Sequence, residues 1–138
     1  MSIAISEEHR LLAETAGDLL TNRDARGAAR ELLEAPEETV GGWWKEIVDL
    51  GWLGLHLPED LGGSGFGIEE LVVVTEQMGR ASAPGPFVPT VIASATIAAV
   101  GDDDLRQRLV PALADGSTFA GIAREGDLTV NGSCLLYT

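Results

Sequence analysis

The stretch Gly51–Gly67, GWLGLHLPEDLGGSGFG, constrains the fold of this chain more than any other. It is rich in glycine, contains Pro58 and lies between two segments whose apolar residues have helical spacing. Glycine adopts backbone conformations that other residues avoid, and proline interrupts helices. The stretch therefore predicts either a turn between two packed helices or a glycine-rich loop that holds a ligand.

Apolar residues recur at helical spacing on both sides of this stretch. The pattern predicts two helices capped by Ser6 and Asp24, and a third around residues 43–50 that Gly51 ends. A fourth helix is predicted to begin at Ile68 and to end near Arg80. The first part of the chain is thus expected to be helical.

Two more helices are expected further along the chain. The segment from Val91 to Val100 is apolar nearly all round, so we expect its helix to lie in the middle of a helix cluster. Asp102 can cap the last helix, and Pro111 should distort it near its end.

The periodicity changes from Ser117 onward. Residues 119–123 and 128–130 have strand-like sequence, and Asn131-Gly132 is typical of a two-residue hairpin turn before residues 133–137. We therefore predict a mainly α fold with a helical domain over residues 1–116 and the beginning of a β domain over residues 117–138. A lone hairpin is marginally stable, so we expect this to be part of a longer protein.

Composition excludes several classes of function. The net charge of −13 argues against nucleic acid and against an anionic membrane surface. The longest apolar run, residues 87–100, is shorter than the ~20 residues of a membrane span, and residues 1–10 do not resemble a signal peptide. Cys134 is the only cysteine, and His9 and His56 are the only histidines, so we expect no metal site. These features predict a soluble cytoplasmic protein.

No residue pattern points to a catalytic group. The run GGSGFG is not followed by Lys-Ser/Thr, and the carboxylates of Glu69 and Glu70 would repel a phosphate at the next helix N-terminus. His56 has no carboxylate or nucleophile placed near it in the sequence, so a surface or capping role is favoured. The glycines are accordingly interpreted as a turn.

The best candidate for ligand contact is the segment PGPFVPTV, from Pro84 to Val91. Small and apolar residues at the start of a very apolar helix can form one wall of a groove for an alkyl or ring-bearing substrate. Ordinary packing at a helix start is the alternative. The candidate substrate-binding residues are Pro84, Gly85, Phe87, Val88 and Val91.

The stretch 51–67 closely resembles the pattern GWLGLxxPEExGGxG of the N-terminal helical domain of acyl-CoA dehydrogenases. Further motifs of that family follow in the expected order over nearly the whole chain. They are Glu70-Leu71 with Glu76, Gly79-Arg80, Pro84-Gly85-Pro86-Phe87, Leu105-Arg106-Gln107-Arg108-Leu109 with Pro111 and Leu113, and Asp115-Gly116-Ser117. The PGPF variant resembles actinobacterial members.

This resemblance implies a helical N-terminal domain, a β-barrel-like middle domain and a C-terminal helical bundle, assembled as a homo- or heterotetramer. It implies oxidation of an acyl-CoA thioester to the 2,3-enoyl-CoA by FAD, with electron-transfer flavoprotein or a similar acceptor as partner. It also implies that the segment around Pro84, Gly85, Phe87 and Val88 lines the acyl-chain pocket, in fatty acid or steroid catabolism.

The sequence departs from the family pattern in two places. The catalytic carboxylate of the family belongs to the C-terminal domain, so no residue here is predicted to be the base. Where the family reads xxLTEPxxGSD and contacts the flavin, this chain has Arg124 in place of Thr and lacks GSD. Arg124 is thus the one candidate cofactor-binding residue. The alternative is a non-catalytic partner subunit of a heteromeric acyl-CoA dehydrogenase.

Overall fold

Six α-helices precede a short β-hairpin in the computed structural model, which describes residues 6–35, 42–122, 128–131 and 134–137. The helices are α1 (Glu7–Asn22), α2 (Ala25–Glu34), α3 (Trp44–Asp49), α4 (Ile68–Arg80), α5 (Phe87–Val100) and α6 (Asp103–Ala114). The strands are β1 (Leu128–Asn131) and β2 (Cys134–Tyr137), paired antiparallel. The predicted mainly α fold class is confirmed.

The predicted helix starts are confirmed by their caps. The side chain of Ser6 accepts the N–H of His9, and the side chains of Asp24 and Asp102 accept the N–H groups of Gly27 and Leu105. Each bond satisfies a backbone donor that has no partner inside its own helix. The sequence therefore locates these helix starts correctly.

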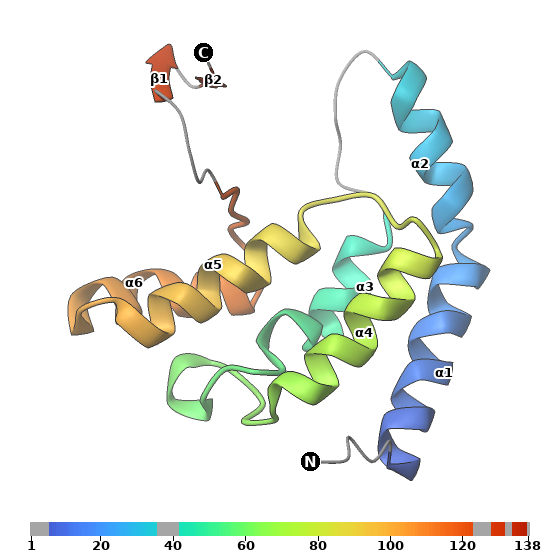
Figure 1. Ribbon diagram of the computed structural model, residues 1–138, viewed down its shortest axis with the longest axis horizontal. Helices are drawn as coiled ribbons and strands as arrows, with labels where there is room; N and C mark the ends of the chain where they lie inside the picture. The colour runs from blue at the N-terminus through green and yellow to red at the C-terminus, as the bar shows by residue number, and fades with distance from the viewer. Residues whose placement is uncertain (1–5, 36–41, 123–127, 132–133, 138) are drawn as a thin grey trace.

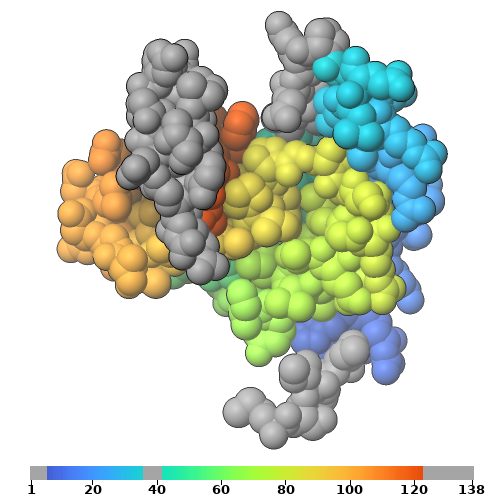
Figure 2. All heavy atoms as spheres, turned by 45° about the horizontal axis from the view of Figure 1, so that its top comes forward, coloured from blue at the N-terminus to red at the C-terminus, as the bar shows by residue number. Residues whose placement is uncertain are grey.

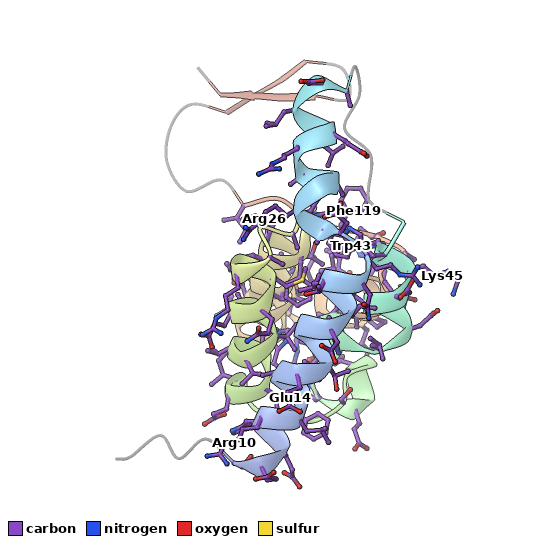
Figure 3. The ribbon with its side chains drawn as sticks, turned by 90° about the vertical axis from the view of Figure 1, so that its right-hand side faces the viewer. Arg10, Glu14, Arg26, Trp43, Lys45 and Phe119 are labelled. Carbon is purple, nitrogen blue, oxygen red and sulfur yellow. The ribbon has the colours of Figure 1, made fainter. Side chains whose placement is uncertain are left out.

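Four of the helices pack as two pairs, and the glycine-rich stretch leads into one pair and contacts the other. Helix α1 lies along α4, and α5 lies along α6, while the segment between α3 and α4 contacts α5 and α6 (Figure 1). Much of the face turned to the viewer in Figure 2 is formed by atoms of α4 and α5. Two of the tryptophans, Trp43 and Trp52, are buried in the main core, whereas Lys45 of α3 points away from the bundle (Figure 3).

A polar clasp joins the N-terminal ends of α1 and α4. The backbone N–H of Ser6 donates to Nδ1 of His9 (3.3 Å), so the imidazole proton lies on Nε2, which donates to Glu70 Oε1 (3.1 Å). The other oxygen of Glu70 accepts the N–H of Gly67 (2.9 Å). The start of α4 is therefore occupied by a carboxylate of the chain itself.

The glycine-rich stretch forms a folded turn. Gly51 has a φ of 71° and ends α3, and two 3₁₀ turns, Trp52–Gly54 and Glu59–Leu61, carry buried apolar residues. A Cβ on Gly63 would lie 2.0 Å from the carbonyl oxygen of Leu57, so only glycine fits there. With Glu70 at the start of α4, this geometry favours the interpretation as a turn over a phosphate loop.

The prediction that α5 lies in the middle of the helix cluster is wrong. Its inner face is buried and includes two polar residues, Thr90 and Ser94, each 0% exposed. Its outer face, which consists of Val88, Ile92, Thr96 and Ala99, is exposed. Thr90 and Ser94 face inward because they form hydrogen bonds with other segments. In a helix that is apolar nearly all round, such tertiary contacts determine which face is buried.

The strand predictions are confirmed only in part. Residues 119–122 belong to no strand, because the sheet in the described residues pairs β1 with β2 only, and Ala123 lies outside the described residues. In the hairpin, Asn131 pairs with Cys134, so residues 132–133 separate the strands instead of the predicted Asn131-Gly132. The boundary between domains at 116/117 stays a prediction.

Among the described residues, no helix is both long enough and apolar enough to span a bilayer.

Candidate functional site

The predicted substrate segment lies between the end of α4 and the first turns of α5. Gly85 has a φ of 115°, in the region that favours glycine, and a Cβ on it would be 3.9 Å from Trp43 Cη2. Pro84 is half-buried. The chain thus turns sharply into α5 against the edge of the Trp43 ring.

The structure divides the predicted residues of α5 between the core and the surface. Phe87 is 1% exposed and Val91 is 4% exposed, and both pack in the same cluster as Trp43. Val88 is 41% exposed and lies on the outer face of α5. Val88 is therefore the one of these three whose side chain is open to a ligand, while Phe87 and Val91 hold the helix in place from behind.

The outer face of α5 is an apolar surface of the helical domain. Val88 and Ile92 are 41% and 47% exposed, and Ala99 is also exposed. The hydroxyl of Thr96 donates to the carbonyl of Ile92 (2.8 Å), so this polar group is already bonded within the helix. The face suits an apolar partner surface or an alkyl chain.

The inner face of α5 contacts His56, which sequence reasoning left without a partner. His56 Nε2 lies 3.4 Å from Ser94 Oγ, and Ser94 also donates to the carbonyl of Val91 (3.0 Å). Burial lowers the pKa of His56, and the carbonyl of Val91 opposes this shift. No local signal could have paired two residues that are 38 positions apart.

The His56–Ser94 pair does not have the arrangement of a nucleophile and its base. Because the hydroxyl proton of Ser94 is directed to Val91, His56 cannot accept it in this geometry. His56 Nδ1 is buried and has no hydrogen-bond partner among the described residues, so no carboxylate orients the ring. The pair therefore anchors α5 and is not a catalytic dyad.

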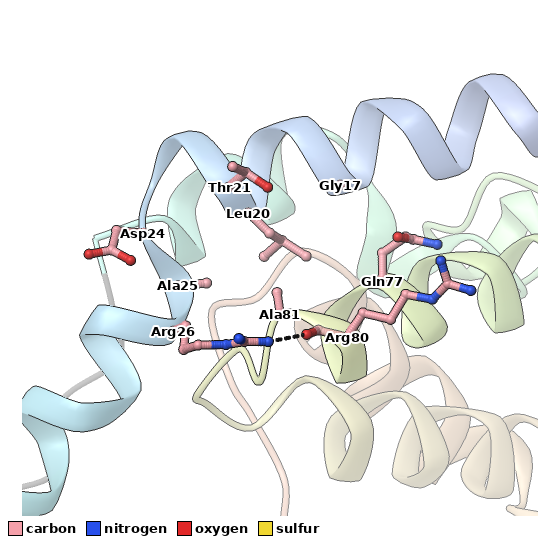
Figure 4. A pocket seen from close by; sticks show the side chains of 9 residues that line it. All are labelled: Gly17, Leu20, Thr21, Asp24, Ala25, Arg26, Gln77, Arg80 and Ala81. Atoms are coloured by element: carbon pink, nitrogen blue, oxygen red, sulfur yellow. Dashed lines mark hydrogen bonds between the residues drawn. The ribbon is translucent and has the colours of Figure 1, made fainter.

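A hollow of about 280 Å³ lies where α1, α2 and α4 meet (Figure 4). Its arginines are already used within the fold: Arg26 donates to the carbonyl of Arg80 (3.0 Å), and Arg80 is paired with Glu76 (2.7 Å). None of the predicted substrate residues lines it. Arg26 thus caps the C-terminal end of α4, and the hollow is a joint between helices. Its lining consists of Gly17, Leu20, Thr21, Asp24, Ala25, Arg26, Gln77, Arg80 and Ala81.

The part of the chain that the structure describes contains no cluster of three or more histidine, cysteine or acidic side chains that could hold a metal ion. Arg124 lies outside the described residues, so its predicted contact with a cofactor is not tested by the structure.

The family profile described as "Acyl-CoA dehydrogenase, N-terminal domain" matches residues 6–117. The chain belongs to the acyl-CoA dehydrogenase family. This family consists of oxidoreductases, and the match includes every described helix and the whole of the predicted substrate segment.

Individual acyl-CoA dehydrogenases agree with this assignment. Acyl-CoA dehydrogenase FadE34 of Mycobacterium tuberculosis is 35% identical over 111 residues, which are 78% of this chain and 15% of FadE34. The solved steroid ACAD Tcur3481-Tcur3483 has 33% identity and a TM-score of 0.73, over 84% of this chain and 32% of that one. The ChsE4-ChsE5 complex of Mycobacterium tuberculosis shares the fold, with 24% identity and a TM-score of 0.77, over 98% of this chain and 39% of that one. The chain thus spans well under half of each.

Acyl-CoA dehydrogenases bind FAD, but the described residues do not by themselves fit a flavin. Three buried polar atoms have no partner among them: Trp43 Nε1, His56 Nδ1 and Arg106 Nε. These atoms come from the start of α3, from the segment before Pro58 and from α6, whereas flavin and its phosphates need several donors from neighbouring residues. The segment at the position of the family's flavin-contacting one begins at Ile122, and its remaining residues, 123–127, lie outside the described residues.

Proposed function

We propose that this chain is the N-terminal part of an FAD-dependent acyl-CoA dehydrogenase subunit, which oxidises an acyl-CoA thioester to the 2,3-enoyl-CoA. The observation that carries this proposal is the outer face of α5. An apolar and exposed helix face directly follows the Pro84-Gly85 turn within a chain of this family. An acyl chain is the apolar ligand that such a face suits.

In this proposal Val88 and Ile92 contact the acyl chain, and Pro84 and Gly85 border its far end. Phe87 and Val91 act from the core by fixing the backbone of α5. Burying one methylene of a ligand contributes about 0.8 kcal/mol, so a face about three helical turns long contributes to affinity and to chain-length preference.

The remaining parts of the reaction belong to other segments. When bound, FAD would supply the hydride acceptor, and the base that removes the α-proton is expected outside residues 1–138. Electron-transfer flavoprotein or a similar acceptor would then reoxidise the enzyme. A homo- or heterotetramer is the proposed assembly, and the likeness to a steroid ACAD makes steroid-derived thioesters one substrate class to test.

The test is to purify the full-length protein that contains this chain and to record its visible spectrum before and after addition of acyl-CoA thioesters without oxygen. The expected result is bound flavin that is bleached by a substrate. A colourless protein that takes up no FAD would refute the proposal. The variant Val88→Ala should change the relative KM values of short and long acyl-CoA substrates.

A second candidate function is a non-catalytic partner subunit of a heteromeric acyl-CoA dehydrogenase. Arg124 in place of Thr favours it, as does the likeness to Tcur3481-Tcur3483, which is named with two components. Co-expression with acyl-CoA dehydrogenase subunits encoded nearby tests this function. Activity of the protein purified alone as a homomer would count against it.

A further inference from the structure

Thr90 makes a hydrogen bond that links two distant segments. It is 0% exposed on the inner face of α5, and its hydroxyl oxygen accepts the backbone N–H of Ala120 at 3.2 Å. The two residues are 30 positions apart, so the bond is purely tertiary. A buried threonine with such a partner does more than fill space.

Other helical threonines of this chain use their hydroxyl groups locally. Thr75 and Thr96 each donate to the carbonyl four residues earlier, at 2.8 Å, as threonine commonly does within helices. The backbone N–H of Thr90 donates to the carbonyl of Pro86 (3.0 Å), so its helical bond is intact. Its side-chain oxygen is left to accept the N–H of a different segment.

Ala120 lies in the segment that leads from α6 toward the proposed β domain. Its neighbour Phe119 packs edge-on against Trp44, with ring centroids 6.4 Å apart. The stretch at the position of the family's flavin-contacting segment begins two residues after Ala120, at Ile122. Along the sequence of α5, Thr90 lies between Val88 and Ile92, but on the inner face, opposite the proposed acyl-chain surface.

We propose that Thr90 is a positioning residue that fixes α5, and thereby the acyl chain, relative to the segment entering the β domain. This inference rests on the proposed function. The Thr90–Ala120 bond joins the helix that carries the proposed acyl-chain surface to the segment that follows α6.

Ser94 provides a matched control. It is also 0% exposed and lies one helical turn further along the same inner face. Its hydroxyl contacts Val91 and His56, both within the helical domain. Removing the Ser94 hydroxyl disturbs a buried polar group to a similar degree and leaves the bond to Ala120 intact.

The first measurement is hydrogen exchange of the Ala120 amide in the full-length protein. In Thr90→Val, which keeps the volume and loses the acceptor, this amide should exchange about threefold to tenfold faster, the factor that one net hydrogen bond represents. Thr90→Ser and Ser94→Ala should leave its exchange unchanged. Unchanged exchange in Thr90→Val, or an equal increase in Ser94→Ala, would overturn the inference.

The second measurement is the rate of flavin reduction by saturating acyl-CoA. Misplacing a substrate by about 1 Å can lower the rate of a reaction on the order of a hundredfold. Thr90→Val should therefore slow flavin reduction tenfold or more, with the FAD content of the enzyme unchanged. Thr90→Ser should restore the rate, and Ser94→Ala should keep it near that of the wild type. A Thr90→Val enzyme that reduces its flavin at the wild-type rate would also overturn the inference.

If Thr90→Val does not fold, Ala120→Pro removes the donor of the same bond. It should slow flavin reduction, whereas Thr90→Ser should not. Any other result overturns the inference. A wild-type protein without flavin would refute the proposed function, and the exchange comparison would still decide on Thr90.

Discussion

Gly63→Ala tests how tightly the glycine-rich stretch is packed. A Cβ at this position would lie 2.0 Å from the carbonyl oxygen of Leu57, and contacts below 3.0 Å are essentially never seen, so the two backbones must separate by about 1 Å. Leu57 is 1% exposed, and its carbonyl accepts the N–H of Gly65 at 2.9 Å. Overpacking costs about 1–3 kcal/mol and the weakened bond about 1, so we expect a loss of about 2–4 kcal/mol.

The assay is thermal unfolding of the full-length protein and of two glycine variants, followed by far-ultraviolet circular dichroism. Gly63→Ala should lower the midpoint of the helical domain by about 6–12 °C. Gly79→Ala is the control, because a Cβ there meets no atom within 4 Å and alanine favours the helix by about 0.8–1 kcal/mol. If Gly63→Ala melts no lower than the wild type, the stretch is not packed as described here.

Three further predictions concern α4 and α5. Ser82 has a φ of 50°, so Ser82→Gly should raise the thermal midpoint by relieving about 1 kcal/mol of backbone strain, and a lower midpoint would contradict this. Phe87→Ala should lower the free energy of unfolding by about 3–5 kcal/mol, because Phe87 is 1% exposed. Val88→Ala should alter acyl-CoA KM values with a far smaller change in the midpoint of urea unfolding. Equal losses of stability in the two variants would contradict this difference. Hydrogen bonds from its own backbone N–H, from His9 and from Gly67 lower the pKa of Glu70. The ionised carboxylate therefore stabilises the fold at pH values above its ordinary pKa of 4.5, and this contribution is lost as the pH falls through the lowered pKa. Glu70→Gln should flatten that part of the stability profile, and an unchanged acid slope would exclude the contribution.

Local signals in the sequence were sufficient to predict the helices. Ser6, Asp24 and Asp102 are capping residues whose bonds reach only three positions along the chain, so they can be recognised without tertiary information. Gly51 ends α3 for an equally local reason, a φ of 71°. Of these residues, only Gly51 also belongs to the motifs that carry the family resemblance.

The orientation of α5 could not be predicted in this way. An apolar helix has no polar face to mark its exposed side. The inward direction is set by the hydrogen bond from the Ala120 N–H to Thr90 and by the one between Ser94 and His56. Both partners are at least 30 positions away. Residues 119–122 were expected to form a strand because their sequence is strand-like. Such a sequence does not reveal whether a neighbouring strand is available for pairing.

The pairing of α1 with α4 also bears on the order in which the chain folds. His9 and Glu70 are 61 positions apart, so docking of α1 must close a long loop, whereas α5 and α6 are neighbours along the chain. Contacts between distant positions form more slowly than local ones. Helix α1 is therefore expected to dock only after the stretch 51–67 has turned the chain back. During synthesis its apolar face would remain uncovered until α4 has emerged.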